Sequence, residues 1–209
     1  SVLIPKLGSD ALDQFYSLLK AQQRTVRDLC VGMHSETQKD NNAQYFLTVP
    51  RAARYFIAAF PERLARNKVL TLTFSCADDR DLAMVLLNSN VHFWYYGVVG
   101  DGFLTNLEVV SSFAAPANPS TEYRFLARRL LEAMPSCTTF ARNRGMLVPS
   151  YNFNKRMDIL LEIDDWVVRH LAPDLNLPRD TFAQYKSNSF LRPLVYLRPA
   201  SCAEGPSNE

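Results

Sequence analysis

Leu87-Asn88-Ser89-Asn90-Val91-His92-Phe93-Trp94-Tyr95-Tyr96-Gly97-Val98-Val99-Gly100-Asp101-Gly102-Phe103 is the stretch of sequence that decides the fold. It joins the Leu-Asn-Ser end of a predicted helix to an aromatic cluster and then to a Gly-Asp-Gly turn. Four consecutive aromatic residues point in several directions around a helix, so Phe93–Tyr96 is expected mainly in the core rather than as a platform for stacked bases. The glycines at 97, 100 and 102 are expected to end the helical segment.

Upstream of this stretch, the pattern predicts a strand followed by a helix. Residues 69–74 alternate and are rich in strand-forming types. Asp78 is expected to cap the helix, with Asp81 in its acidic first turn. The buried face of that helix is expected to carry Leu82, Val85, Leu86, Ser89 and Phe93.

The rest of the chain adds mostly helices. Amphipathic spacing predicts helices over residues 10–27, about 120–134, 154–171 and 178–186. We also expect a polar loop over 32–44, a strand over 45–49, a turn at 143–145, and a short strand or one helical turn over 107–113. The predicted fold class is α+β, with helices packed on small mixed or antiparallel sheets and no Rossmann-type sheet.

The length of 209 residues fits one large domain, or two small subdomains around a shared core. The Pro-containing segment Ala114–Pro119 is the best candidate boundary. We therefore expect an N-terminal recognition subdomain over residues 1–117, a mainly helical subdomain over 118–199 and a disordered tail over 200–209.

The charge balance does not by itself announce nucleic-acid binding. The net charge is only +2, with 23 Lys and Arg against 21 Asp and Glu. Its distribution is uneven, at +4 over residues 1–70 (10 against 6), −4 over 71–118 (1 against 5) and +2 over 119–209 (12 against 10). The basic excess therefore lies in the two outer parts of the sequence.

Four widely separated cysteines suit reduced thiols better than a disulfide framework or a zinc site. No apolar run approaches the length of a membrane span and no signal peptide is recognised, so we expect a cytoplasmic protein without a membrane partner. The start at Ser1, just before strand-like Val2-Leu3-Ile4, suggests a piece of a longer chain, with a processed N-terminus as the alternative.

Catalytic motifs are not found in the sequence. Gly100-Asp101-Gly102 follows a helix and lacks the third glycine of a dinucleotide fingerprint, and no P-loop or metal-ligand spacing occurs. His34, His92 and His170 are isolated, and ordinary packed or surface roles are the better interpretation. We therefore assign no catalytic residue and no metal ligand, although a Cys–His pair distant in sequence stays possible.

Two segments together resemble the target-recognition domain of adenine-N6 DNA methyltransferases of the type IIG restriction–modification or BREX-like kind. The first, residues 69–116, has a strand, a helix ending in Leu87-Asn88-Ser89, the aromatic run, the Gly-Asp-Gly turn and Pro116. The second, residues 151–182, leads from Tyr151-Asn152-Phe153-Asn154-Lys155 into Leu161-Glu162-Ile163-Asp164 and a short last helix. They cover under half of the chain, in the order that the family shows.

The resemblance implies that this chain reads the sequence of duplex DNA, while a separate catalytic domain of the same polypeptide binds S-adenosylmethionine and extrudes the adenine. Such a methyltransferase also needs an Asn/Asp-Pro-Pro-Tyr/Phe loop, and neither this loop nor a glycine-rich methyl-donor turn occurs here. We therefore expect no cofactor in this chain. The parent protein is expected to be a site-specific, type II DNA modification enzyme that acts in phage defence.

Candidate DNA contacts follow from side-chain chemistry, because phosphates attract Lys and Arg while amides, carboxylates and guanidinium groups read base edges. The candidates for base contact are Gln38, Lys39, Asn41 and Asn42 in the polar loop, and Asp101 and Asn106 around the glycine-rich turn. The candidates for phosphate contact are Arg51, Arg54 and Lys68. For each of them, a merely solvated side chain is the alternative, as it is for the arginines of the 120–134 helix.

A protein of another class also fits the sequence. The chain could be an interaction or assembly domain that docks a partner through an aromatic surface and never contacts DNA, and the low net charge favours this alternative. A small enzyme with an unrecognised site is a third possibility. The ordered pair of segments favours DNA recognition.

Overall fold

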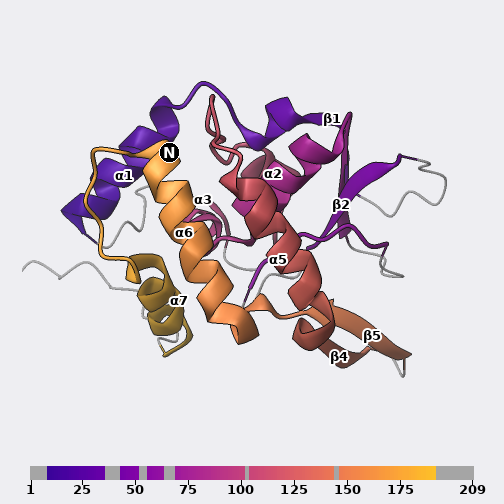
Figure 1. Cartoon of the computed structure of the whole chain (residues 1–209). Helices are drawn as coiled ribbons and strands as arrows, with labels where there is room; N and C mark the ends of the chain where they lie inside the picture. Colours follow the sequence, from indigo (N-terminus) through magenta and orange to yellow (C-terminus); the bar gives the residue numbers. More distant parts are fainter. Residues whose placement is uncertain are drawn as a thin grey trace, which may run out of the picture.

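The computed structural model of this chain describes residues 9–35, 43–51, 56–63, 69–101, 104–143 and 146–191, with the backbone alone for 141–143, 146–148 and 187–191. Helices pack with a three-stranded and a two-stranded antiparallel sheet (Figure 1), which confirms the predicted α+β class. The α-helices are α1 (Asp10–Ala21), α2 (Ala77–Asn88), α3 (Asn90–Val99), α4 (Leu107–Ser111), α5 (Glu122–Cys137), α6 (Met157–Leu171) and α7 (Thr181–Leu191). The strands are β1 (Cys30–His34), β2 (Tyr45–Pro50), β3 (Val69–Phe74), β4 (Thr138–Asn143) and β5 (Met146–Tyr151), and the 3-10 turns are η1 (Val26–Leu29) and η2 (Phe153–Arg156).

The larger sheet has β3 in its centre, with β1 and β2 antiparallel to it on either side. Tyr45 pairs with Phe74 at one end of the sheet, and Pro50 pairs with Val69 at the other. Since both outer strands run against β3, they run parallel to each other. The strand ends at Pro50, His34 and Val69 therefore lie toward the same end of the sheet.

A serine separates α2 from α3. The sequence predicted a helix end at Leu87-Asn88-Ser89 but also carried the helical segment on to the glycines, and the structure has two helices that meet at Ser89. The Ser89 hydroxyl accepts a hydrogen bond from the His92 backbone N–H at 2.9 Å and donates one to the Leu86 carbonyl at 2.7 Å. Ser89 thus serves as the N-cap of α3 and closes the last turn of α2. The predicted buried face is correct, because its five residues are all buried.

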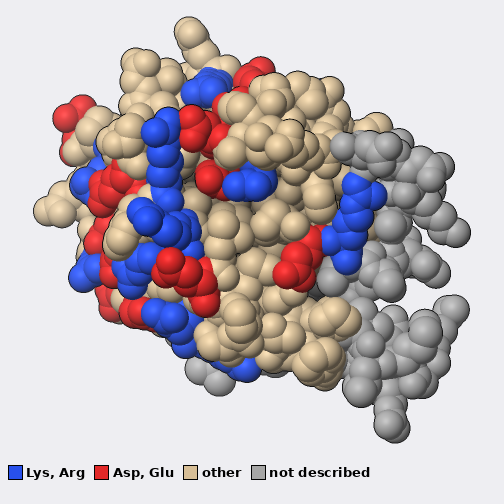
Figure 2. Space-filling model, turned by 45° about the vertical axis from the view of Figure 1, so that its right-hand side comes forward, with Lys and Arg blue, Asp and Glu red and all other residues tan. Residues whose placement is uncertain are grey.

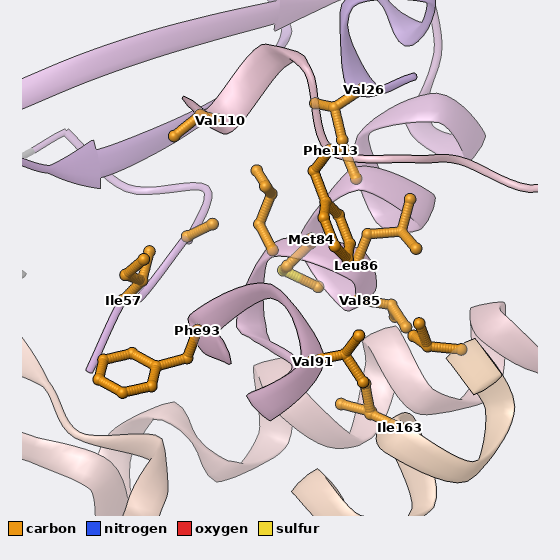
Figure 3. Close-up of a cluster of buried hydrophobic side chains, with 14 of the residues drawn as sticks. Val26, Ile57, Met84, Val85, Leu86, Val91, Phe93, Val110, Phe113 and Ile163 are labelled. Atoms are coloured by element: carbon orange, nitrogen blue, oxygen red, sulfur yellow. The ribbon is translucent and has the colours of Figure 1, made fainter. Parts of the chain in front are cut away.

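One hydrophobic core joins the two parts of the chain. Figure 3 shows members of this cluster from α2, α3 and α6, among them Leu86, Val91 and Ile163. The aromatic run Phe93–Tyr96 is buried as well, which confirms that it belongs to the core. Trp94 packs among Phe15, Tyr16 and Phe182, so α1 and α7 meet at this side of α3.

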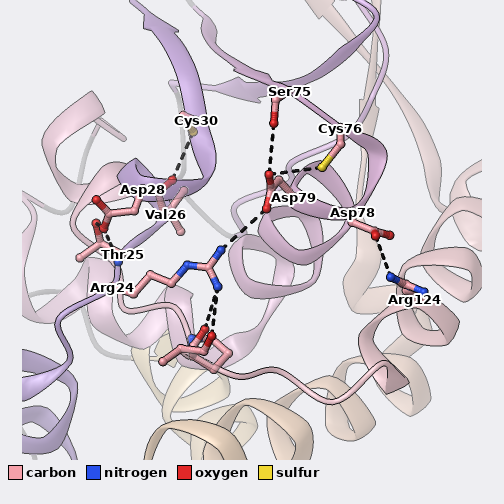
Figure 4. A network of polar contacts seen from close by, with 12 residues as sticks. Arg24, Thr25, Val26, Asp28, Cys30, Ser75, Cys76, Asp78, Asp79 and Arg124 are labelled. Carbon is pink, nitrogen blue, oxygen red and sulfur yellow. Dashed lines mark hydrogen bonds and ion pairs between the residues drawn. The ribbon is translucent and has the colours of Figure 1, made fainter.

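Polar contacts fix the segment after α1 to the start of α2 (Figure 4). The Arg24 guanidinium donates to the carbonyls of Pro116 and Ala117 and lies 3.8 Å from the Asp79 carboxylate. Asp78, in the first turn of α2, pairs with Arg124 of α5 at 2.6 Å. The N-cap residue of α2 is Cys76, so the prediction that Asp78 caps this helix was wrong.

After α5 the chain forms a β-hairpin. The sequence predicted its turn at 143–145 but not its two strands. Strands β4 and β5 pair from Thr138 opposite Tyr151 to Asn143 opposite Met146. The Asn152 N–H donates to the Cys137 carbonyl at 2.9 Å and closes the root of the hairpin. Helix α6 then runs beside α5 (Figure 1).

Several predicted boundaries were wrong for local reasons. Helix α1 ends at Ala21, because the chain turns at Gln22 and then pairs Thr25 with Ala114. Strand β1 takes in residues 32–34 of the predicted loop. Of the two alternatives predicted for 107–113, a short strand or one helical turn, the helical one is correct, as α4 over Leu107–Ser111. Gly97 lies inside α3, where a Cβ would sit 3.2 Å from the Tyr185 hydroxyl, and Gly100 ends the helix, where a Cβ would meet the Tyr96 carbonyl at 2.6 Å.

Candidate nucleic-acid interface

The two segments that carry the family resemblance meet through Asn90 and Asp164, and Lys186 of α7, four residues beyond the second segment, completes a buried polar cluster. The Asp164 carboxylate of α6 accepts hydrogen bonds from the Asn90 backbone N–H and from its side-chain amide, both at 2.8 Å. The Asn90 amide oxygen in turn accepts a hydrogen bond from the Lys186 ammonium of α7 at 3.0 Å. One amide therefore bridges a carboxylate and an ammonium group.

Burial changes the ionisation of both charged members of this Asn90–Asp164–Lys186 cluster. Loss of hydration raises the pKa of Asp164 to about 7, although its bonds to the α3 backbone and Asn90 act in the opposite direction. Loss of hydration likewise lowers the pKa of Lys186 to about 8, against the attraction of Asp164. Each group has less than one tenth of its surface exposed, so the cluster is closed to substrates. Its geometry suits the joining of helices.

Asn88, two residues before Asn90, fixes a different segment. Its side-chain amide donates to the Ala59 carbonyl at 2.7 Å and to the Met84 carbonyl at 2.8 Å. The Ala59 N–H donates back to the Asn88 side-chain oxygen at 3.1 Å. The Asn-Ser-Asn step therefore holds the 56–60 segment, the start of α3, and helices α6 and α7.

Three candidate DNA contacts lie together at the Pro50–Val69 end of the three-stranded sheet. The Thr105 N–H donates to the Arg51 carbonyl at 2.7 Å, which brings the end of β2 against the segment before α4. Asp101 accepts from the Leu104 N–H at 2.9 Å, and Asn106 accepts from the Val109 N–H at 2.8 Å. Both side chains thus support the backbone locally, Asn106 as the N-cap of α4.

Two polar atoms beside this contact have no hydrogen-bond partner among the residues that the structure describes. They are Arg51 Nε and Thr105 Oγ1, and both are buried. An unpaired buried donor is costly, so both atoms would gain from a further partner.

The other candidates, Gln38, Lys39, Asn41, Asn42, Arg54 and Lys68, lie outside the described residues. Their neighbours in sequence are nevertheless placed. Arg54 follows Arg51 by three residues, and Lys68 directly precedes Val69, which pairs with Pro50. The segment that holds residues 38–42 begins after His34, which pairs with Thr71 near the same end of the sheet.

The arginines of α5 and α6 mostly face carboxylates. Figure 2 shows basic and acidic side chains interleaved over one side of the molecule, beside a largely uncharged area. Arg129 contacts Glu162 and Asp158, and Arg169 contacts Glu122 at 3.2 Å. Arg128 lies over the Phe125 ring, 5.9 Å from its centroid. This surface is not a basic patch of one sign.

The histidines and cysteines occupy separate places. His92 is buried, its Nδ1 lies 3.0 Å from the Leu87 carbonyl, and burial lowers its pKa to about 4. His170 stacks on Trp166 with ring centroids 4.3 Å apart. Cys30, Cys76 and Cys137 are free thiols, and no group of three potential metal ligands occurs within the described ranges.

Sequence reasoning missed Lys186 and the pairing of Asn90 with Asp164. Asp164, quoted above only as part of the Leu161–Asp164 segment, joins α6 to the start of α3. The available signal was a lone acidic residue on the apolar stripe of α6, between Ile163 and Val167.

Comparison with known proteins adds no relative: no family model, no curated protein and no solved structure matches this chain. In the part of the chain that the structure describes, no helix is both long enough and apolar enough to cross a membrane.

Proposed function

We propose that this chain is the DNA target-recognition part of a cytoplasmic, site-specific adenine-N6 DNA methyltransferase of the restriction–modification type. The observation that carries the proposal is the bond between Asn90 and Asp164. These residues belong to the two segments that resemble the family, and 74 positions separate them. Their direct contact makes the two short patterns parts of one buried arrangement, which is what a shared domain type would require.

The candidate DNA contacts support the same proposal through their placement. Arg51 and Asn106 lie close together, and residues 54 and 68 adjoin the same end of the sheet in sequence. Phosphate contacts position a protein on the duplex and base contacts select the sequence, so a working site needs both kinds of side chain within reach of one groove. The Pro50–Val69 end of the sheet offers that combination.

Methyl transfer and S-adenosylmethionine are assigned to a separate domain of the proposed parent enzyme. The titratable groups of the Asn90–Asp164–Lys186 cluster are enclosed by α3, α6 and α7 and are given no catalytic step. The role of the present chain is to bind duplex DNA and to set the recognised sequence.

The test is fluorescence anisotropy of this chain with a duplex of randomised sequence, titrated with salt. The proposal expects log K to fall linearly with log salt between about 50 mM and about 200 mM, because bound phosphates release counterions. Selection of a preferred site from the pool should follow, and alanine substitutions of Gln38, Asn41 or Asn42 should relax that preference. Absence of binding at the lowest salt would overturn the proposal.

A docking domain that never meets DNA is the competing function. The aromatic run cannot supply its surface, because Phe93–Tyr96 is buried. Such a domain would have to use other exposed apolar side chains, such as Phe125 or Phe140. Lack of salt-dependent DNA binding in the experiment above would favour this alternative.

A further inference from the structure

Two side chains on one face of the three-stranded sheet remain partly exposed. Helix α2 packs against the opposite face of β2 and β3 (Figure 1), where the Arg80 guanidinium lies 5.8 Å from the centroid of the Tyr45 ring. Because side chains alternate along a strand, Phe46 points to the face away from α2 and pairs across the sheet with Thr73. Phe46 and Thr71 are half-buried on that face. The three strands contain no Asp, Glu, Lys or Arg, so charge on this face comes from neighbouring segments.

Arg63 brings a positive charge to this face. Phe60 exchanges backbone hydrogen bonds with Thr48 of β2 at 2.8 and 3.2 Å. Because this pairing is antiparallel, the chain after Phe60 runs back toward the start of β2. The Arg63 guanidinium carbon therefore lies over the Phe46 ring, 5.1 Å from its centroid. Such a cation–π contact restrains the guanidinium and leaves most of its N–H donors for other partners.

Arg63 has no carboxylate partner within the described residues. Its neighbour in sequence, Glu62, accepts a hydrogen bond from the Tyr151 hydroxyl instead. Arg124 and Arg129 of α5, by contrast, each pair with an acid. The Arg63 side chain is also exposed. An exposed guanidinium that a ring restrains and no acid neutralises suits an oxyanion such as phosphate.

We propose that Arg63, held by Phe46, binds a backbone phosphate of duplex DNA and extends the phosphate contacts of the sheet end along β2. Phe46 precedes the candidate phosphate contact Arg51 by five positions, which span about 16 Å in a strand. This is the axial length of about five successive phosphates of one DNA strand. The inference rests on the proposed function and adds to it a phosphate contact, with Phe46 as its positioning residue.

The test is the anisotropy titration with the randomised duplex, applied to Arg63→Gln. Loss of one phosphate contact should weaken binding about tenfold and lower the slope of log K against log salt by about one. Arg63→Lys keeps the charge and should restore the slope, although an ammonium group lacks the planar fork and should bind less tightly than wild type. A restored slope would not follow if Arg63 served only the fold.

The matched control is Arg128→Gln on α5. Arg128 also lies over a phenylalanine ring, that of Phe125, at 5.9 Å from its centroid. Both side chains are exposed, and Arg128 likewise has no carboxylate partner in the part of the chain that the structure describes. Because this pair lies on a helix and not on the sheet, Arg128→Gln should change affinity less than about twofold.

A double-mutant cycle tests whether Phe46 acts through Arg63. Phe46→Leu keeps an apolar side chain but removes the ring, and should weaken binding about threefold, as expected for loss of an exposed cation–π contact. In the Arg63→Gln background the same substitution should have no further effect on affinity. Equal losses in both backgrounds would show that Phe46 does not position Arg63. Phe125→Leu is the control and should leave affinity unchanged.

The outcomes separate this inference from the proposed function. If the wild-type chain binds DNA with steep salt dependence while Arg63→Gln loses no more affinity than Arg128→Gln, the inference is wrong and the proposed function stands. If the wild-type chain binds no DNA, both are wrong. Urea midpoints followed by circular dichroism establish that each variant is folded. Since Arg63 is exposed, its substitution tests the phosphate contact even if Phe46→Leu lowers stability.

Discussion

At the scale of single residues, the side-chain amide of Asn90 has an orientation that its two neighbours dictate. Its N–H donates to the Asp164 carboxylate and its oxygen accepts from the Lys186 ammonium. An amide is the side chain that offers a donor and an acceptor in this arrangement without adding charge. A carboxylate and an ammonium group can remain buried here because each has hydrogen-bond partners.

Asn90→Ala removes the bridge and leaves both groups buried without it. We expect the free energy of unfolding to fall by about 2–4 kcal/mol, since an unsatisfied buried charge carries most of its desolvation penalty. Urea unfolding followed by circular dichroism measures this. Asn118→Ala, at an exposed position, is the control and should change stability by less than about 0.5 kcal/mol. An equally small effect of Asn90→Ala would show that the cluster does not hold the fold.

His92 predicts acid sensitivity of a definite sign. Burial lowers its pKa from 6.5 in the unfolded chain to about 4 in the folded one, so the unfolded chain binds more protons between these values. Stability from His92 is therefore present above about pH 6.5 and is lost as the pH falls toward 4. The His92→Leu variant has no imidazole at this position in either state. As the pH falls across that interval, the free energy of unfolding of the wild type should therefore decrease by on the order of 3 kcal/mol relative to that of the variant.

The comparison needs urea midpoints of both proteins at several pH values. Asp164, whose pKa is raised to about 7, has the opposite slope over an overlapping interval, but it is present in both proteins and cancels from the difference. If the difference in unfolding free energy between wild type and variant does not change with pH, the His92 imidazole takes up a proton equally readily in the folded and the unfolded chain, and its pKa is not lowered by burial.

At the scale of elements, Asn106 at the start of the short helix α4 has one observed role and one proposed role. As the N-cap its side-chain oxygen binds the Val109 N–H, and as a base reader its amide would contact adenine. Asn106→Ala should reduce stability by about 1 kcal/mol, and Asn106→Ser should restore it, because serine also caps helices. Urea unfolding measures this. Equal losses in both variants would contradict the capping role.

Elements with strong periodicity could be predicted from the sequence, and weakly patterned ones could not. The alternation of β3 and the apolar stripe of α6 mark them clearly, and both were found close to their observed bounds. The two strands of the β4–β5 hairpin were not predicted, because a proline, Pro149, lies within β5 and the register can be seen only once the strands pair. Strand β1 was not predicted, because Gly32 and the polar residues that follow it resemble a loop.

The candidate site was predictable to a smaller degree, because it depends on contacts between distant segments. The proximity of Arg51 to Asn106 follows from one backbone hydrogen bond to Thr105, which no local pattern indicates. The same holds for Asn90 and Asp164. Residue chemistry could nominate members of a site, but the fold decides which of them are neighbours.

At the scale of the whole molecule, the core does not divide at the predicted boundary between residues 117 and 118. Val91 and Ile163 belong to one buried cluster, and the bond between Asn90 and Asp164 spans the same boundary. Most of the apolar surface of α5 and α6 is buried in the core that α2 and α3 also build. We expect the two parts to unfold together.

Single-tryptophan variants test this expectation. Trp166→Phe leaves Trp94 as a probe of the first part, and Trp94→Phe leaves Trp166 as a probe of the second. The urea midpoint from fluorescence should agree with that from circular dichroism in each variant, as a two-state transition requires. Within either variant, a fluorescence transition separated from the circular dichroism transition would instead support two independently stable subdomains.

The hydrogen bonds of Asn90 to Asp164 and Lys186 also have a consequence for the sequences of homologous chains. An amide that must satisfy a carboxylate on one side and an ammonium on the other cannot change alone, so positions 90, 164 and 186 are expected to covary across homologous chains. A lineage that loses the acid at 164 should lose the lysine as well and fill the space with apolar side chains. Three correlated columns, at spacings of 74 and 22 residues, would then identify distant homologues whose remaining sequence has diverged.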